Sequence, residues 1–130
     1  MLENDVPNFK VDIREKNFDV NLEITLLTNQ AFTIGAVVSF LGLVRDLSKS
    51  NDLKFMEIEH YPAMSKKMLG ALCKKACERW NLKGITLIHR VGKLYPGDQI
   101  VLLVIASMHR TEAFNASEFI MDFLKSEAPF

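Results

Sequence analysis

The sequence lacks a surplus of either charge, and this balance argues against several functions. Its 130 residues contain 16 Lys and Arg against 16 Asp and Glu, so the formal net charge is zero. A general nucleic-acid-binding protein needs a basic surplus to neutralise phosphates. We therefore exclude that class, although a local basic pocket for a small anion remains compatible with a neutral chain.

Long apolar runs are missing too. No run reaches the roughly 20 residues of a membrane span, and the first ten residues, MLENDVPNFK, lack the apolar core of a signal peptide. We therefore expect a cytoplasmic protein. Cysteine is scarce: Cys73 and Cys77 lie in a helical pattern, CKKAC, that fits neither a C-x-x-C motif nor a zinc site. We expect both to be thiols of the core.

Motifs of common enzyme classes are also absent. The sequence contains no Gly-rich phosphate loop and no Ser-His-Asp spacing typical of a hydrolase. Its three histidines and scattered carboxylates form no metal-binding pattern. We predict neither a metal site nor a bound cofactor. A metal-dependent enzyme is not expected, because the sequence offers no set of metal ligands.

What is present predicts one α+β domain covering residues 1–130. The hydrophobic share of 48% and charged share of 25% are ordinary for a globular protein. Residues 1–17 are expected to form an N-terminal arm that contains a strand. Apolar patterns predict further strands at 18–20, 34–45, 53–61, 84–94 and 99–108. Spacings of three and four predict helices at 21–29, 63–80 and 112–125.

The strand patterns predict a mostly antiparallel sheet with helices packed on one side. Residues 34–45 are apolar on both faces, which indicates a central strand, and Gly42 indicates a bulge or a close backbone approach. The segment YPGD, 95–98, is typical of a type II turn or of a slightly longer hairpin loop, and it is expected to join two strands into an antiparallel hairpin. Thr111 is a candidate N-cap of the last helix, and Phe114 is expected to face inward.

Polar side chains that could carry chemistry gather at the ends of the predicted elements. They are Arg45, His60, His89, Arg90, His109, Arg110 and Lys125. Each also has an ordinary explanation, such as the first exposed residue after a core strand or, for Lys125, a helix-terminal cation. The His109–Arg110 pair is the strongest candidate, because it lies where a core strand meets a helix N-terminus, which can hold an anion. Lys125 lies at the other end of that helix, roughly 20 Å away.

Several segments resemble, in order, the large catalytic subunit of molybdopterin synthase. They are GAVVSFLGLVRD, EIEHYPAMSKKML, IHRVGKLYPGD, SMHRTEAFNASEFIMDFLK and EAPF, within residues 34–130. The resemblance implies an α/β hammerhead-like fold and a sulfurtransferase of molybdenum cofactor biosynthesis. This family converts cyclic pyranopterin monophosphate into molybdopterin by installing a dithiolene. The sulfur arrives as a thiocarboxylate on the C-terminal Gly-Gly of a small ubiquitin-like subunit, whose tail enters a pocket of the large subunit.

The resemblance also implies site residues and an assembly. Lys125 corresponds to the family's essential active-site lysine, and Arg45, His109 and Arg110 correspond to substrate-pocket residues. Two large subunits form a central homodimer with a small subunit at each end, which makes a heterotetramer. A site shared between subunits, for example with Arg45 from the neighbour, would accommodate the separation along the helix. Because the partner brings the sulfur, this chain needs no catalytic cysteine.

One departure from the family pattern leaves two alternatives. The pattern continues after APF with Trp and a second active-site lysine, whereas this sequence stops at Phe130. Either a tail follows Phe130, or the protein is truncated. Truncation would favour a non-catalytic binding or scaffold module that docks the ubiquitin-like carrier. The retained Arg45, His109, Arg110 and Lys125 favour the enzyme.

Overall fold

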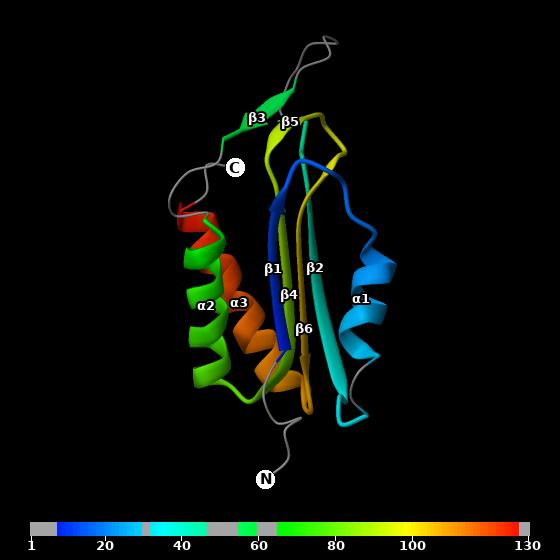
Figure 1. The fold of residues 1–130 in the computed structure, drawn as a ribbon, viewed down its shortest axis with the longest axis vertical. Helices are drawn as coiled ribbons and strands as arrows, with labels where there is room; N and C mark the ends of the chain where they lie inside the picture. The colour runs from blue at the N-terminus through cyan, green and yellow to red at the C-terminus, as the bar shows by residue number, and fades with distance from the viewer. Residues whose placement is uncertain (1–7, 30–31, 47–54, 60–64, 128–130) are drawn as a thin grey trace.

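A computed structural model describes residues 8–29, 32–46, 55–59 and 65–127 of the chain. In it, four strands form one long sheet with helices against both of its faces (Figure 1). The elements in chain order are β1 (Asn8–Arg14), α1 (Val20–Thr28), β2 (Ala36–Leu43), β3 (Met56–Ile58), α2 (Lys66–Arg79), β4 (Leu82–Arg90), β5 (Gly92–Leu94), β6 (Gln99–Ser107) and α3 (Arg110–Glu127). No helix in these ranges is both long and apolar enough to cross a membrane.

The main sheet has the order β1-β4-β6-β2. The β1–β4 pair is parallel, whereas the β4–β6 and β2–β6 pairs are antiparallel. A smaller antiparallel sheet joins β3 to β5 beyond one end of the main sheet (Figure 1). The predicted α+β class with a mostly antiparallel sheet is therefore confirmed.

The helices do not all lie on one side of the sheet, so that prediction is wrong. In Figure 1, α2 and α3 cover one face and α1 covers the other. The reason lies in the central strands: on β6, Leu103 and Ile105 belong to the larger core cluster, whereas Leu102 and Val104 belong to a second cluster under α1. A strand that is apolar on both faces needs a cover on each.

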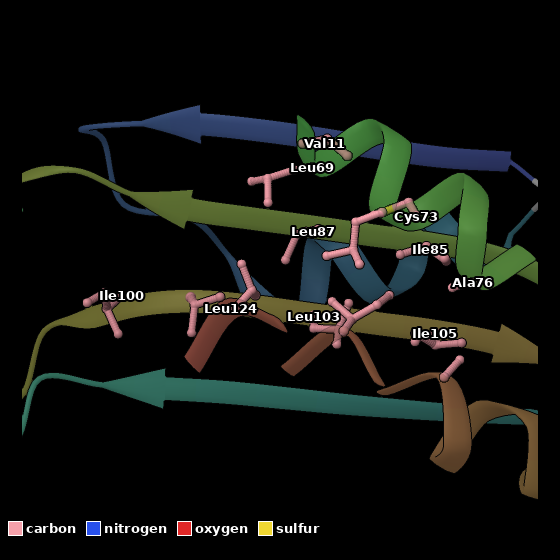
Figure 2. Packing of buried hydrophobic residues seen from close by; sticks show 14 of the residues in the cluster. Val11, Leu69, Cys73, Ala76, Ile85, Leu87, Ile100, Leu103, Ile105 and Leu124 are labelled. Carbon is pink, nitrogen blue, oxygen red and sulfur yellow. The ribbon is translucent and has the colours of Figure 1, made fainter. Parts of the chain in front are cut away.

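The larger core lies between the sheet and the pair α2 and α3 (Figure 2). Leu69, Cys73 and Ala76 of α2 are fully buried against strands β1 and β4. On the α3 side, Leu124 lies over Ile100 and Leu103 of β6, as Figure 2 shows. This packing fixes the course of α3 along the sheet, from the end of β6 back toward its start.

Strand β2 is an edge strand, which contradicts its predicted central position. Among the described strands it pairs with β6 alone. Several of its apolar side chains are exposed, with Phe40 at 41%, Leu41 at 40% and Leu43 at 53%. An apolar pattern indicates that side chains favour burial, but it does not say which molecule supplies the cover. The bulge predicted at Gly42 is confirmed, because the register shifts between Gly42 and Leu43.

Two glycines with positive φ shape the segment between β4 and β6. At Gly92, with φ +93°, the predicted strand 84–94 divides, and β5 leaves the main sheet to pair with β3. The predicted type II turn is confirmed: Gly97 has φ +92°, and the Asp98 N–H donates to the Tyr95 carbonyl at 2.9 Å. The turn follows β5, so it does not connect β4 directly to β6.

Two short segments differ from the prediction. The expected strand at 18–20 is wrong, because Asp19 is the N-cap of α1 and its carboxylate accepts from the Leu22 N–H at 3.0 Å. The expected strand at 53–61 is reduced to β3 within the described residues 55–59. At 18–20, the capping hydrogen bond of Asp19 overrides the apolar pattern. At 53–61, the strand is limited by its short pairing partner, β5.

Candidate active site

The antiparallel strands β2 and β6 place the predicted site residues at opposite ends of the sheet. Ala36 at the start of β2 lies opposite Ser107, and Leu43 at its end lies opposite Gln99. Arg45 follows β2 at the second of these ends. His109 and Arg110 follow β6 at the first.

Helix α3 returns along the sheet and brings Lys125 to the end where Arg45 lies. Fifteen residues separate Arg110 from Lys125, which corresponds to about 22 Å along a helix. One chain therefore holds two separate pairs, Arg45 with Lys125 and His109 with Arg110. It does not bring Arg45 together with the other two predicted substrate-pocket residues.

Lys125 lines a pocket of about 460 Å³ between the end of β2 and the end of α3. Strand residues 40–43, 100 and 101 form one wall, and Met121, Asp122 and Lys125 form the other. Gly42 allows the strands to pack closely here, since an added Cβ would lie 2.7 Å from Cγ1 of Val101. The pocket is thus mostly apolar, with one ammonium group from Lys125 and one carboxylate from Asp122. Such a lining suits an extended, uncharged chain whose terminal anion lies at Lys125.

His109 and Arg110 lie on the turn between β6 and α3. The predicted N-cap at Thr111 is wrong, because α3 already begins at Arg110 and Thr111 lies within its first turn. The residue before the helix is His109, which has no side-chain oxygen to accept from the first N–H groups. By contrast, Asp19 and Ser65 cap α1 and α2. The start of α3 therefore presents N–H donors and a positive dipole end beside two basic side chains.

The charges at both ends are unpaired within the described part of the chain. Arg45, His109, Arg110 and Lys125 are all exposed, and none of their side chains forms an ion pair or hydrogen bond with a described residue. The cation Lys10, in contrast, binds the buried carboxylate of Glu23 at 3.0 Å. The cations Arg45, Arg110 and Lys125 and the imidazole of His109 are therefore available to an external anion.

The other polar candidates have structural roles or lie outside the described residues. His89 is fully buried in β4, where its Nδ1 lies 2.8 Å from the Arg90 carbonyl oxygen, and burial lowers its pKa. Arg90 donates to the carbonyls of Glu15 at 3.1 Å and Gln99 at 2.9 Å. His60 lies outside the described residues.

The cysteines are poor nucleophiles in this fold. Both are free thiols, and burial, followed by the charge of a neighbour, raises the pKa of Cys73 to about 12 and that of Cys77 to about 11. Neither lines the Lys125 pocket. Within the described ranges, no group of three or more His, Cys, Asp and Glu side chains is placed to hold a metal ion.

Sequence reasoning missed the apolar lining of the pocket. Phe40, Leu43 and Met121 read as ordinary core positions, yet they lie around Lys125. Gly42 was the available signal, because a glycine in an apolar strand indicates a close approach. Nothing in the sequence pattern alone placed that strand beside the end of the last helix.

Comparisons with known proteins identify the family of the chain. The family model described as MoaE protein matches residues 13–127. The molybdopterin synthase catalytic subunit of Ralstonia nicotianae is 52% identical over 120 residues, which cover 92% of this chain and 68% of that protein.

Solved structures show the same fold. The molybdopterin biosynthesis MoaE protein from Burkholderia ambifaria matches with a TM-score of 0.82 at 40% identity, covering 95% of this chain and 80% of that one. Molybdopterin synthase from Staphylococcus aureus matches with a TM-score of 0.76 at 29% identity, covering 90% and 84%. From the extent of the family match and the identity to its members, the chain belongs to the MoaE protein family.

Proposed function

We propose that this protein is the catalytic subunit of a molybdopterin synthase. It transfers sulfur from a thiocarboxylated small carrier subunit to cyclic pyranopterin monophosphate and so forms the molybdopterin dithiolene. The observation that carries the proposal is Lys125, whose ammonium lines a mostly apolar pocket and forms no ion pair with a described carboxylate, including Asp122 of the same pocket. Membership of the MoaE family supports the same activity.

Lys125 acts on the carrier's thiocarboxylate. Its ammonium neutralises the negative charge of the incoming group. Once the tail covers the pocket, the apolar side chains of Phe40, Leu43 and Met121 would exclude water and strengthen that attraction. The ammonium of Lys125 can also donate a proton to the reacting groups. The high pKa values of Cys73 and Cys77 agree with a mechanism in which the partner supplies the sulfur.

The partner is a small ubiquitin-like subunit whose C-terminal Gly-Gly tail enters the Lys125 pocket. A narrow tail without side chains is compatible with the pocket of about 460 Å³ that Gly42 and Lys125 line. The extended tail would lie along the end of β2, with its thiocarboxylate at Lys125. The body of the carrier stays outside the pocket.

The phosphate of the pterin binds at the His109–Arg110 turn. Arg110 offers a bidentate contact, His109 a further donor, and the start of α3 its free N–H groups. Arg45 completes the substrate pocket from the other end of the sheet. Because about 22 Å of helix separates these ends in one chain, the complete site needs a second copy.

The second copy forms a homodimer through the exposed apolar side of β2. Phe40, Leu41 and Leu43 give this edge strand a surface that favours burial. The same side chains line the Lys125 pocket, so the dimer interface and the carrier pocket would adjoin along β2. One copy then supplies Arg45 and Lys125, and the other supplies His109 and Arg110. With a carrier at each outer end, the assembly is a heterotetramer.

A cytoplasmic location belongs to the same proposal, and the two free thiols are compatible with a reducing compartment.

The test is single-turnover conversion by the full-length protein with thiocarboxylated carrier and cyclic pyranopterin monophosphate. Lys125→Ala should lower the rate by about 100-fold or more, the scale of a lost acid–base or charge-stabilising group. The matched control is Lys74→Ala, which removes another exposed lysine from the solvent face of α2 and should leave the rate unchanged. Carrier binding and Tm should stay nearly constant in both variants. A wild-type rate in Lys125→Ala would overturn the proposed mechanism.

A further inference from the structure

The turn that carries His109 and Arg110 is held by two small residues from neighbouring strands. Gly35 precedes β2, and Ser107 ends β6 directly opposite Ala36. The Gly35 N–H donates to the Ser107 carbonyl at 3.0 Å. The start of β2 is thus bonded to the last residue before the turn.

Gly35 lies against the backbone of the turn itself. An added Cβ would overlap the carbonyl oxygen of Met108 and lie 3.4 Å from its carbonyl carbon. Because these are backbone atoms, they cannot rotate away as the end of a flexible side chain can. Any larger residue at position 35 must therefore displace Met108, and His109 follows Met108 directly.

Ser107 holds the same turn from inside. Its side chain is fully buried, and its hydroxyl donates to the carbonyl of His109. This bond spans two residues and closes the turn before α3 begins, as serine side chains commonly do in such bends. Without the hydroxyl, the His109 carbonyl loses its partner within the turn.

The side chains of His109 and Arg110 depend on this backbone for their position. Both are exposed, and neither makes a hydrogen bond or ion pair with a residue in the described ranges. Their reach toward an anion is therefore set by where the turn places their Cα atoms. A displacement of about 1 Å at a binding group is enough to weaken its contact strongly.

We propose that Gly35 and Ser107 are positioning residues that set the His109–Arg110 turn for the phosphate of the pterin substrate. The inference rests on the proposed function, because it assigns the turn to that phosphate. Gly35 and Ser107 do not touch the substrate. They act through His109 and Arg110, so changing them should affect pterin affinity and leave the carrier pocket at Lys125 unaffected.

The first experiment measures the Kd of cyclic pyranopterin monophosphate by titration of the assembled protein. Gly35→Ala should weaken binding by about tenfold or more, while the Kd for the carrier changes by less than about twofold. Gly84→Ala is a matched control, because a Cβ there, two strands away from β2, would also collide, but with Leu27 and the Asn8 carbonyl oxygen instead of the turn backbone. Gly70→Ala meets nothing within 4 Å and controls for the substitution itself. Equal losses of pterin affinity in Gly35→Ala and Gly84→Ala would overturn the proposal.

Ser107 provides a second test that does not depend on how Gly35→Ala folds. Ser107→Ala should weaken pterin binding, and Ser107→Thr, which keeps the hydroxyl, should restore a large part of it. Wild-type affinity in Ser107→Ala, or an equal loss in Ser107→Thr, would contradict the positioning role.

A double-mutant cycle separates positioning from general damage to the fold. In the background His109→Ala/Arg110→Ala, Gly35→Ala should cause less than about a twofold further loss, because the groups it places are gone. A full additional tenfold loss would refute the inference. If His109→Ala/Arg110→Ala itself binds the pterin as the wild type does, the proposed phosphate site fails, which is a different result.

Discussion

Strands β2 and β6 lie side by side and are both almost entirely apolar, yet their surroundings differ. Every residue from 100 to 107 in β6 is buried, whereas β2 has no fully buried residue and exposes Phe40, Leu41 and Leu43. The difference follows from pairing: β6 has a strand on each side and helices over both faces, and β2 has one described neighbour. One strand completes the fold of the chain, and the other presents a surface that suits a second molecule.

The same pair of strands also separates the site. Antiparallel neighbours end at opposite edges of a sheet, so Arg45 after β2 and Arg110 after β6 lie far apart. The eight residues of β2 span about 25 Å at 3.3 Å per residue. If the site residues act together, the exposed strand must be where a second copy supplies the missing half.

The largest expected effect is therefore complementation between two inactive variants. Lys125→Ala and His109→Ala/Arg110→Ala homodimers should each lack activity. A mixed dimer, purified with two different tags, should recover about half of the wild-type activity, because one of its two sites is intact. Single-turnover conversion measures the recovery, and a mixed preparation of Lys125→Ala with itself is the control.

An inactive mixed dimer would show that each site lies within one chain, against the roles proposed for the two ends. Light scattering of the wild type gives an independent check. A monomer at micromolar concentration would remove the shared site altogether.

A matched substitution on the two strands sharpens the comparison in energetic terms. Leu41 of β2 and Leu102 of β6 are directly paired, but Leu41 is 40% exposed and Leu102 is fully buried. Leu102→Ala should lower the free energy of unfolding by about 2–5 kcal/mol, as in other leucine truncations in protein cores. Leu41→Ala should cost the isolated subunit less than about 1 kcal/mol but weaken the dimer.

Chemical denaturation measures the first quantity, and sedimentation equilibrium measures the second. Two outcomes would break the comparison. Equal losses of subunit stability would mean that β2 is covered by its own chain, and an unchanged dimer constant in Leu41→Ala would place the interface elsewhere.

Much of the fold was predictable because its signals are local. The spacing of three and four identified α2 and α3, and the Pro-Gly pair in YPGD identified the type II turn at Gly97. The predicted central position of 34–45 was wrong for a physical reason: an apolar strand has the same sequence pattern whether it lies in the centre or, like β2, at the edge of the sheet. Phe114 illustrates the same limit, since it was expected to face inward and is 59% exposed.

The site was less accessible than the fold from sequence. The resemblance named Arg45, His109, Arg110 and Lys125, and the family match confirms the resemblance, but the roles of these residues stay predictions. Which of them share a pocket depends on the order β1-β4-β6-β2 and on the return path of α3. Long-range pairing of this kind has no local signal, so the grouping of Lys125 with the end of β2 required the structure.

A smaller effect is expected from His89, which lies in β4 next to Val101 of β6. Burial lowers its pKa below 6.5, so the unfolded chain binds a proton that the folded chain resists. Stability should therefore fall as the pH drops below about 6.5, by up to about 1.4 kcal/mol per unit of pH from this group. Thermal unfolding from pH 8 to pH 5 should show a steeper decline in the wild type than in His89→Leu. Parallel profiles would mean that His89 does not couple folding to pH.

The smallest expected effect tests whether the well-packed side of the sheet takes any part in the chemistry. Cys73 and Cys77 lie on α2, against the core rather than at β2. With pKa values of about 12 and about 11, fewer than about one thiol in 1,000 is ionised near neutral pH.

A Cys73→Ser/Cys77→Ser variant should lose about 1–2 kcal/mol of stability, because Cys73 is fully buried and a hydroxyl there lacks the thiol's apolar character. Its single-turnover rate should match the wild type at a temperature where both are folded. A folded variant without turnover would make the thiols participants and would contradict the proposal that sulfur reaches the pterin from the carrier alone.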